Sequence, residues 1–109
     1  MIIIAGSMRF AAADRDDVLA SLTEVTEASR GDAGCVEYFW SEDLDAPNTF
    51  RFFECWESQQ LFEAHLGQPH EAAFAERNLG RMTAATATTY QATAAPLPGA
   101  GSATRSASR

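Results

Sequence analysis

The sequence contains no lysine, only two cysteines and no long hydrophobic run, and each absence excludes a class of function. Without lysine, the chain lacks a Schiff-base nucleophile and the lysine of a phosphate-binding loop. Cys35 and Cys55 are too few for a disulfide framework or a tetrathiolate zinc site. The longest apolar run, residues 1–5, is too short for a membrane span or a signal peptide, so we expect a cytoplasmic protein.

Positive charge is scarce as well. The chain of 109 residues has 15 acidic and 8 basic residues, which gives a formal net charge of −7. Because Arg105 and Arg109 lie at the end of the chain, residues 1–93 hold all the acidic residues and a net charge of −9. Such a field repels phosphate backbones and anionic lipid headgroups, so we expect neither nucleic acid nor a membrane as a partner.

The composition changes near the end of the chain. From Ala94 onward, the sequence AAPLPGAGSATRSASR has Leu97 as its only large apolar residue. A segment with so little apolar surface cannot offset the entropy lost on ordering. We therefore predict one folded domain over residues 1–93 and a disordered tail over residues 94–109.

Hydrophobic periodicity divides the domain into strands and helices. It predicts strands over residues 2–10, 35–41, 49–56 and 83–91 and a helix over about 14–30. Ser58 is a suitable cap for a second helix that ends at Gly67, and Pro69 suits the first position of a third. This order is typical of an α+β fold of the ferredoxin-like, split βαβ type, in which helices cover one face of a four-stranded antiparallel sheet.

The two central strands form a hairpin whose register we predict from Ser41 facing Thr49. The side chains then separate into two faces. The face that meets the helices carries Val36, Tyr38, Trp40, Phe50, Phe52, Glu54 and Trp56. The other face carries Phe39, Arg51 and Phe53, and it puts Cys35 directly opposite Cys55, where we expect free thiols. A sheet covered on one side only should have a polar second face, but this face carries two phenylalanines. We therefore expect Phe39, Arg51 and Phe53 to form a homodimer interface.

Histidine and glutamate on the aromatic face are the candidates for chemistry. The second helix should bring His65 close to Glu54 and Trp56, and a histidine against apolar walls can transfer protons near neutral pH. Taken alone, a histidine on an apolar helix face is more often a core residue with one satisfied hydrogen bond. Glu54 could be a general base, an anchor for His65, or a strand-end residue that reaches water. We predict His65, Trp56 and Glu54 as catalytic residues. We predict, as substrate-binding residues, Tyr38, Phe50, Phe52, Phe62 and His70, although core packing is the alternative for the aromatic ones.

Metal and cofactor motifs are absent from the pattern. His65 and His70 are five residues apart, with Gly67 and Pro69 between them, and this is not the i, i+4 spacing of a helical metal site. No nearby acidic residue completes a facial triad. We therefore predict no metal and no cofactor.

The stretch GCVEYFWSEDLDAPNTFRFFECWESQQLFEAHLGQPH resembles the antibiotic biosynthesis monooxygenase domain family. The matching residues are Gly34, Tyr38, Asp43, Pro47, Phe50, Glu54, Trp56, His65 and His70. The resemblance extends over residues 1–93 in the order of elements. It implies a homodimeric α+β barrel with a pocket between the sheet and helices of each subunit. For some members it implies oxygenation of polycyclic phenols or quinols by dioxygen without metal, flavin or haem.

The chain departs from two subgroups of that family. Phe52 stands where members that oxygenate aromatic polyketides have an asparagine, and Ser7 stands where haem-degrading relatives have one. We predict a cofactor-independent monooxygenase that oxidises a quinol or polyphenol, with the ring between Trp56 and Phe52 and its proton taken by His65. The alternatives are a non-catalytic dimeric module that binds a hydrophobic metabolite, a haem-binding or haem-degrading protein, and an isomerase.

Overall fold

The computed structural model describes residues 1–99. Short 3-10 turns lie over Ala12–Asp14 and Leu79–Arg81. The helices are α1 (Arg15–Ser29), α2 (Gln59–Leu66) and α3 (Pro69–Asn78), and the strands are β1 (Ile2–Phe10), β2 (Cys35–Glu42), β3 (Thr49–Trp56) and β4 (Met82–Gln91). These bounds differ from the predicted ones by one residue at most.

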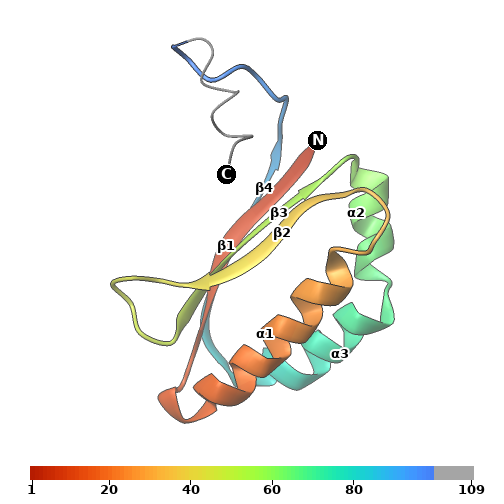
Figure 1. The fold of residues 1–109 in the computed structure, drawn as a ribbon. Coiled ribbons are helices and arrows are strands. Elements are labelled where there is room, and N and C mark those ends of the chain that lie inside the picture. Colours follow the sequence, from red (N-terminus) through yellow and green to blue (C-terminus); the bar gives the residue numbers. More distant parts are fainter. Residues whose placement is uncertain (100–109) are drawn as a thin grey trace.

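The four strands form one antiparallel sheet in the order β2-β3-β1-β4. The three helices lie on one side of this sheet, and among residues 1–99 nothing covers the other side (Figure 1). The α+β ferredoxin-like fold is therefore confirmed. A single chain does not test the predicted dimer.

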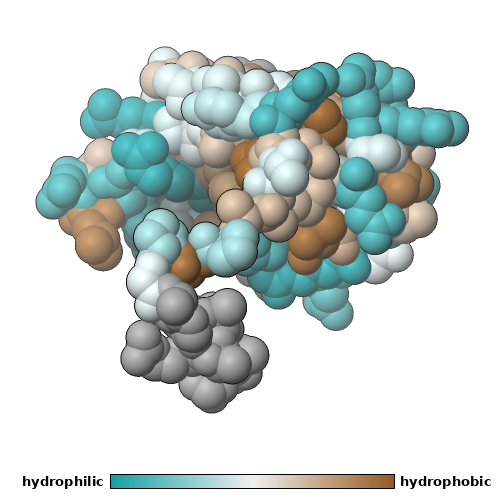
Figure 2. All heavy atoms as spheres, turned by 90° about the horizontal axis from the view of Figure 1, so that it is seen from above, coloured by the Kyte–Doolittle hydropathy of each residue, from teal (hydrophilic) through white to brown (hydrophobic). Residues whose placement is uncertain are grey.

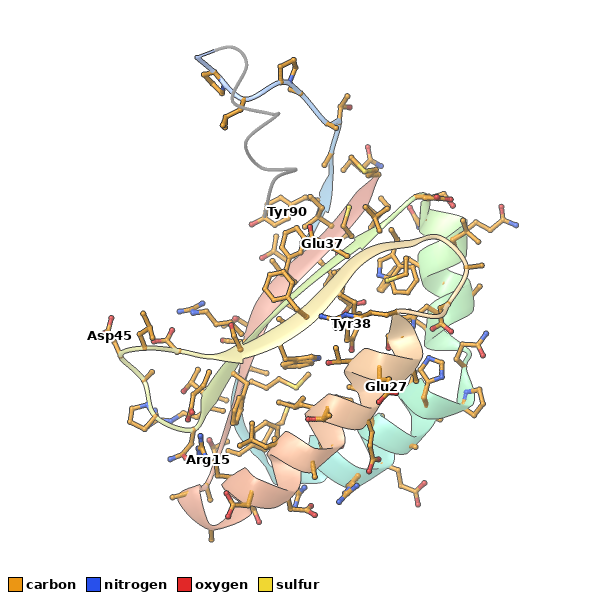
Figure 3. All side chains as sticks on the ribbon, in the orientation of Figure 1. Arg15, Glu27, Glu37, Tyr38, Asp45 and Tyr90 are labelled. Carbon is orange, nitrogen blue, oxygen red and sulfur yellow. The ribbon has the colours of Figure 1, made fainter. Side chains whose placement is uncertain are left out.

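Alternation along the strands builds the core between sheet and helices. Ile2, Ile4 and Phe10 of β1 are buried, and they pack with Val18, Leu22 and Val25 from one face of α1. Gly6 allows β1 to approach β4, because a side-chain carbon there would overlap the backbone at Thr86 and Ala87. On β2, Glu37 and Tyr38 project to opposite sides of the sheet (Figure 3), and only Tyr38 is buried.

The hairpin register differs from the prediction by two residues. Ser41 pairs with Arg51, Tyr38 with Glu54 and Trp40 with Phe52. The turn decides this: Asp43 accepts hydrogen bonds from the backbone of Asp45 and Ala46, and Asn48 adopts a positive φ of 61°. Because the shift is even, Tyr38, Trp40, Phe50, Phe52, Glu54 and Trp56 stay on the face toward the helices as predicted.

Two details of the predicted hairpin are wrong. A bulge between Cys35 and Glu37 removes Val36 from the helix-facing row, and its side chain is 50% exposed. Cys35 lies opposite Trp56, and Cys55 lies opposite Glu37, so the two cysteines are not directly paired. Both are free thiols, as predicted.

The chain leaves the sheet after Gln91. Residues 92–97 form neither helix nor strand, and residues 98–99 form a turn that lies apart from the sheet (Figure 1). The rest of the predicted tail, residues 100–109, lies outside the described residues. Among residues 1–99, no helix is long and apolar enough to cross a membrane.

Candidate active site

His65 lies at the centre of a buried aromatic cluster. Its side chain is 1% exposed, and its ring stacks on Trp56 with 4.5 Å between ring centroids. Tyr38 presents its ring edge-on at 5.9 Å, and Phe62 of α2 lies at 6.3 Å. The predicted position of His65 over the aromatic face of the hairpin is confirmed.

Three carboxylates surround this imidazole. Asp32 Oδ2 lies 2.7 Å from Nδ1, Glu71 Oε2 lies 3.2 Å from Nε2, and Glu54 Oε1 lies 3.7 Å from Nε2. Burial alone would lower the pKa of His65, but the carboxylates of Glu71, Asp32 and Glu54 outweigh it, and the pKa is raised above its ordinary value. The site thus favours a positively charged ring.

Glu54 is buried beside the same ring, as predicted. Its side chain is 13% exposed, and Oε1 accepts a hydrogen bond of 3.0 Å from Trp56 Nε1. Burial is the main reason why the pKa of Glu54 is raised above its ordinary value, against the opposing effects of Trp56 and His65. Glu54 therefore anchors the indole while keeping a proton near neutral pH more readily than an exposed glutamate.

Asp32 reaches His65 because the loop after α1 is tightly folded against α2. The backbone N–H of Asp32 donates to Ser29, and that of Cys35 donates to the carbonyl of Asp32. Gly34 has a φ of +82°, and the space beside it is filled by Leu61. Only glycine allows the loop to come this close to α2 in that conformation.

His70, in the first turn of α3, completes the cluster. Its Nε2 lies 2.7 Å from Asp32 Oδ2, so one carboxylate oxygen contacts both histidines. The side chain of His70 is 22% exposed, whereas that of His65 is nearly inaccessible. The sequence-based expectation was that no acidic residue nearby in the chain completes a set with the two histidines; Asp32 reaches them from a distant part of the chain.

A cavity of about 630 Å³ opens on the other side of Tyr38, between α1 and the hairpin. Its apolar walls are Leu19 and Leu22 of α1, Trp40 of β2 and Phe50 of β3, and Arg30 lines it at the end of α1. A volume of this size is typical of small-molecule sites. Tyr38 lies between β2 and α1, and Glu27, also at the cavity, projects from α1 (Figure 3).

Tyr38 links the cavity to the histidine cluster. Its hydroxyl accepts a hydrogen bond of 3.2 Å from Trp40 Nε1, and its backbone carbonyl accepts one of 2.9 Å from Arg30 Nε. Burial raises the pKa of Tyr38 well above its ordinary value, so the phenol stays neutral. Trp40 and Arg30 are thus both held by one buried residue.

The predicted site residues fall into two groups. His65, Glu54, Trp56 and Phe62 belong to the closed cluster, whereas Phe50 lines the cavity and Phe52 supports its wall by packing on Trp40 at 4.8 Å. Trp56 stacks on His65 itself, and Phe52 packs on a different ring. The catalytic and substrate-binding roles of all these residues, including Tyr38 and His70, stay predictions.

Sequence reasoning missed Asp32, Glu71 and Arg30. Arg30 could have been noticed in the sequence, because it is the only basic residue between Arg15 and Arg51 and follows directly after the helical pattern. Asp32 precedes the matched Gly34 by two residues, but nothing local indicates that it meets His65. Glu71 follows His70 directly and resembles any acidic residue of a first helical turn.

The face of the sheet away from the helices carries the residues of the predicted dimer. Phe39 and Phe53 stack with 5.5 Å between centroids, and Phe39 is 38% exposed. From residue 83 onward, every residue of β4 is exposed. Seen from above, hydrophobic residues lie among hydrophilic and intermediate ones on the surface (Figure 2).

Comparison with known proteins identifies relatives with this arrangement. The family model for antibiotic biosynthesis monooxygenase matches residues 1–77. A solved structure from Deinococcus radiodurans, described as a candidate antibiotic biosynthesis monooxygenase, is 26% identical, with a TM-score of 0.82 over 89% of this chain and 97% of that one. A protein of unknown function from Bacteroides thetaiotaomicron, described as a possible oxidoreductase, is 19% identical and shares the fold with a TM-score of 0.76 over 82% and 94%.

An uncharacterized protein of Synechocystis is 29% identical over 77 residues, which are 71% of this chain. The match spans about half, 52%, of that relative's length. The match of the family model over most of the domain confirms the resemblance found in the sequence. The chain belongs to the antibiotic biosynthesis monooxygenase family.

Proposed function

We propose that this protein is a cofactor-independent monooxygenase that oxidises a quinol or polyphenol with dioxygen. The observation that carries the proposal is the cavity between α1 and the hairpin, which combines the flat apolar walls of Trp40 and Phe50 with the cation of Arg30. A planar, electron-rich ring that ionises to a phenolate matches both features. Membership in a family named for monooxygenases supports the reaction class.

The proposed reaction needs no external reductant, because the substrate supplies all the electrons. One oxygen atom of dioxygen enters a ring C–H bond as a hydroxyl group. The two hydroxyl hydrogens of the quinol leave with the other oxygen atom as water, and the product is a hydroxyquinone. The protein's task is then to ionise the substrate, orient it and exclude water.

Each wall of the cavity has a role in this proposal. Trp40 and Phe50 hold the ring by stacking, and Tyr38 fixes Trp40 through the hydrogen bond to its indole nitrogen. Arg30 donates through Nε to Tyr38, so its terminal N–H groups remain for the substrate oxygen. A guanidinium there stabilises the phenolate and lowers the energy of the ionised substrate. The proton passes to water at the open side of the cavity.

His65, Trp56 and Glu54 support this site from behind. Tyr38 rests edge-on against His65, and Trp56 is held between His65 and Glu54. We propose that these residues act through Tyr38 by keeping the wall of the cavity rigid. A direct proton transfer from substrate to His65, as predicted from the sequence, would require Tyr38 to move aside.

The test follows oxygen-dependent turnover of a naphthoquinol under air and under argon, with isotopically labelled dioxygen as the source of the inserted atom. The expected result is a labelled hydroxyquinone formed faster than in the blank without protein. Arg30→Gln should lower the rate by about tenfold, less than an enclosed oxyanion donor contributes, because Arg30 is exposed. Trp40→Leu should raise KM more than it lowers kcat.

Arg9→Gln is the matched control, because it removes the same charge from an exposed arginine that does not line the cavity. It should leave the rate unchanged. Saturable quenching of tryptophan fluorescence without turnover would support the non-catalytic binding module and overturn the enzymatic proposal. Equal rates in Arg30→Gln and Arg9→Gln would overturn the assignment of the cavity as the reaction site.

We also propose that the protein works as a homodimer that joins the sheet faces bearing Phe39, Arg51 and Phe53. The proposal is supported by the stacked pair Phe39 and Phe53, which stands on the uncovered face of the sheet. Burying this pair removes apolar surface from water on a domain that buries only about 60–65% of its surface alone.

A further inference from the structure

We propose that Asp32, His65 and His70 bind a divalent transition-metal ion, a property that goes beyond the oxygenation proposed above. Two imidazole nitrogens and one carboxylate oxygen meet here, with both nitrogens 2.7 Å from Asp32 Oδ2 and all three atoms within 4.8 Å of one another. Two histidines and one carboxylate are a ligand set used for zinc and for non-haem iron.

The three ligands are held by separate, well-anchored pieces of backbone. Asp32 lies in the tight loop after α1, and His65 lies in the last turn of α2. The short link to His70 is closed by a hydrogen bond of 3.0 Å from the Gln68 N–H to the His65 carbonyl. A metal at this point would tie α1, α2 and α3 together, and little chain entropy would be lost on binding because the loops are already folded.

Negative charge is gathered around His65. In residues 1–99, Asp32, Glu54 and Glu71 have only histidines as partners in ion pairs, and none of them pairs with an arginine. His65 Nε2 is buried and has no acceptor in hydrogen-bonding geometry, although Glu71 Oε2 lies at 3.2 Å. The fully buried ring therefore presents one nitrogen to the proposed ion and the other to two carboxylates.

A metal on Nδ1 would fix which ring nitrogen carries the proton. Coordination through Nδ1 leaves that proton on Nε2, which lies 3.2 Å from Glu71 Oε2 and 3.7 Å from Glu54 Oε1. A ligating histidine that donates its second N–H to a carboxylate is the common arrangement around protein metals, and it fixes both the tautomer and the ring orientation. A bound metal would thus give a reason for the two carboxylates, Glu71 and Glu54, that lie beside a buried imidazole.

An ion would enter by displacing the Asp32 carboxylate outward. Ligands about 2.1 Å from a common centre are about 3.0–3.4 Å apart, whereas Asp32 Oδ2 lies 2.7 Å from both nitrogens, so this oxygen must move away from the point that both rings face. His70 is the exposed member of the three, with 22% of its side chain accessible. Its side opens the path from solvent, and water or another small ligand would fill the remaining positions on the ion.

The experiment measures zinc and cobalt binding to the full chain, produced without a histidine tag and stripped of metal with a chelator. The chain has only two histidines, both in this cluster, so histidine-dependent binding reports on this site alone. We expect one zinc ion per chain by calorimetry, a higher melting temperature with zinc, and visible absorption bands on addition of cobalt. Absence of stoichiometric binding in the wild type would overturn the proposal.

Variants distinguish this site from general attraction of cations by an acidic protein. His70→Gln and Asp32→Asn should each weaken zinc binding by more than about tenfold, and Glu71→Gln should weaken it by about 10–100-fold as a partner of a ligand. The controls are Asp45→Asn and Glu76→Gln, which remove the same charges at exposed positions. Circular dichroism checks the fold, and equal binding by His70→Gln and Glu76→Gln would refute the assignment.

Failure of this proposal is separable from failure of the proposed function. The cavity lies on the other side of Tyr38, so chelator-treated protein should still oxidise the naphthoquinol if the cavity is the reaction site. Asp32→Asn likewise should lose zinc binding while keeping the oxygen-dependent rate measured without metal. Loss of both properties in Asp32→Asn, in a folded protein, would contradict the separation of the two sites.

Discussion

Gly34→Ala should destabilise the protein strongly, because two independent costs meet at this residue. Its φ of +82° is unfavourable for any residue with a side chain, and this costs about 1–2 kcal/mol. An added methyl carbon would lie 2.5 Å from Leu61 Cδ1 and 2.7 Å from Leu61 Cβ. Since Cβ cannot turn away like the end of a side chain, α2 must move, at a further cost of about 1–3 kcal/mol.

The expected total loss is about 2–5 kcal/mol in the free energy of unfolding, measured by urea denaturation followed by tryptophan fluorescence. The matched control is Gly80→Ala, where an added methyl group would have no neighbour within 4 Å and no positive φ is required. That control should change stability little or raise it by up to about 1 kcal/mol, through the reduced entropy of the unfolded chain.

A second background separates the two costs. In Leu61→Gly protein, which lacks Cβ as well as the rest of the side chain, the space beside Gly34 is emptied, so Gly34→Ala there should cost only the backbone part, about 1–2 kcal/mol. A loss below about 1 kcal/mol in the wild-type background, within the range of ordinary surface substitutions, would refute the reasoning. It would mean that the loop carrying Asp32 is not held against α2 by close contact.

Three further predictions concern other contacts. Asn78→Ala should lower the free energy of unfolding by about 2–3 kcal/mol, because Asn78 is fully buried and its amide donates to Ser21 Oγ and to the Phe74 carbonyl. Chemical denaturation measures this loss, and a value under about 1 kcal/mol would contradict the prediction. Phe53→Asp should convert the proposed dimer to a monomer, as measured by light scattering, whereas Leu44→Asp, at the exposed hairpin turn, should not. An unchanged mass for Phe53→Asp would count against the proposed interface. Hydrogen bonds from Arg77 and Arg81 lower the pKa of Asp17 to about 2, so Asp17 stabilises the fold above its unfolded pKa, and this contribution is lost as the pH falls toward 2. Asp17→Asn should therefore lower the melting temperature at pH 7, and the difference from wild type should disappear toward pH 2; a constant difference would contradict the linkage.

Much of the fold could be predicted because each element has a local cause. Three of these causes act only on neighbouring residues. They are the alternation in β1, the cap at Ser58 and the proline at the start of α3. Ser58 accepts a hydrogen bond from the Leu61 N–H, as a capping residue does. The assignment of side chains to the two faces of the hairpin was correct despite the error in register, because a shift of two residues preserves the alternation.

The register and the bulge could not be predicted, because they depend on side chains that bond within the turn. Asp43 and Asn48 decide where the hairpin closes, and Glu42 accepts the backbone N–H of Asn48 as well as bonds from Arg15 of α1. Any sequence with a six-residue turn rich in Asp, Pro and Asn allows several such closures. The choice among them is made by contacts that the alternation does not encode.

The candidate site divides along the same line between local and distant causes. His65, Trp56 and Glu54 could be brought together from the sequence because a capped helix must lay one face on the hairpin. Asp32 could not, since its contact with His65 spans 33 positions and depends on a loop whose shape follows from one glycine.

The position of the cavity depends on how large rings fill space. Tyr38 could have left room beside His65 or closed it, and the same residue types are compatible with both outcomes. Its hydroxyl pairs with Trp40 and its ring meets His65, so Tyr38 fills that space, and the open volume lies on the other side of Tyr38, against Trp40. A single tyrosine therefore decides whether the buried histidine faces a substrate or a ring of carboxylates. In this chain His65 faces the carboxylates, so the role of His65 is to be tested first by cation binding and then by oxidation.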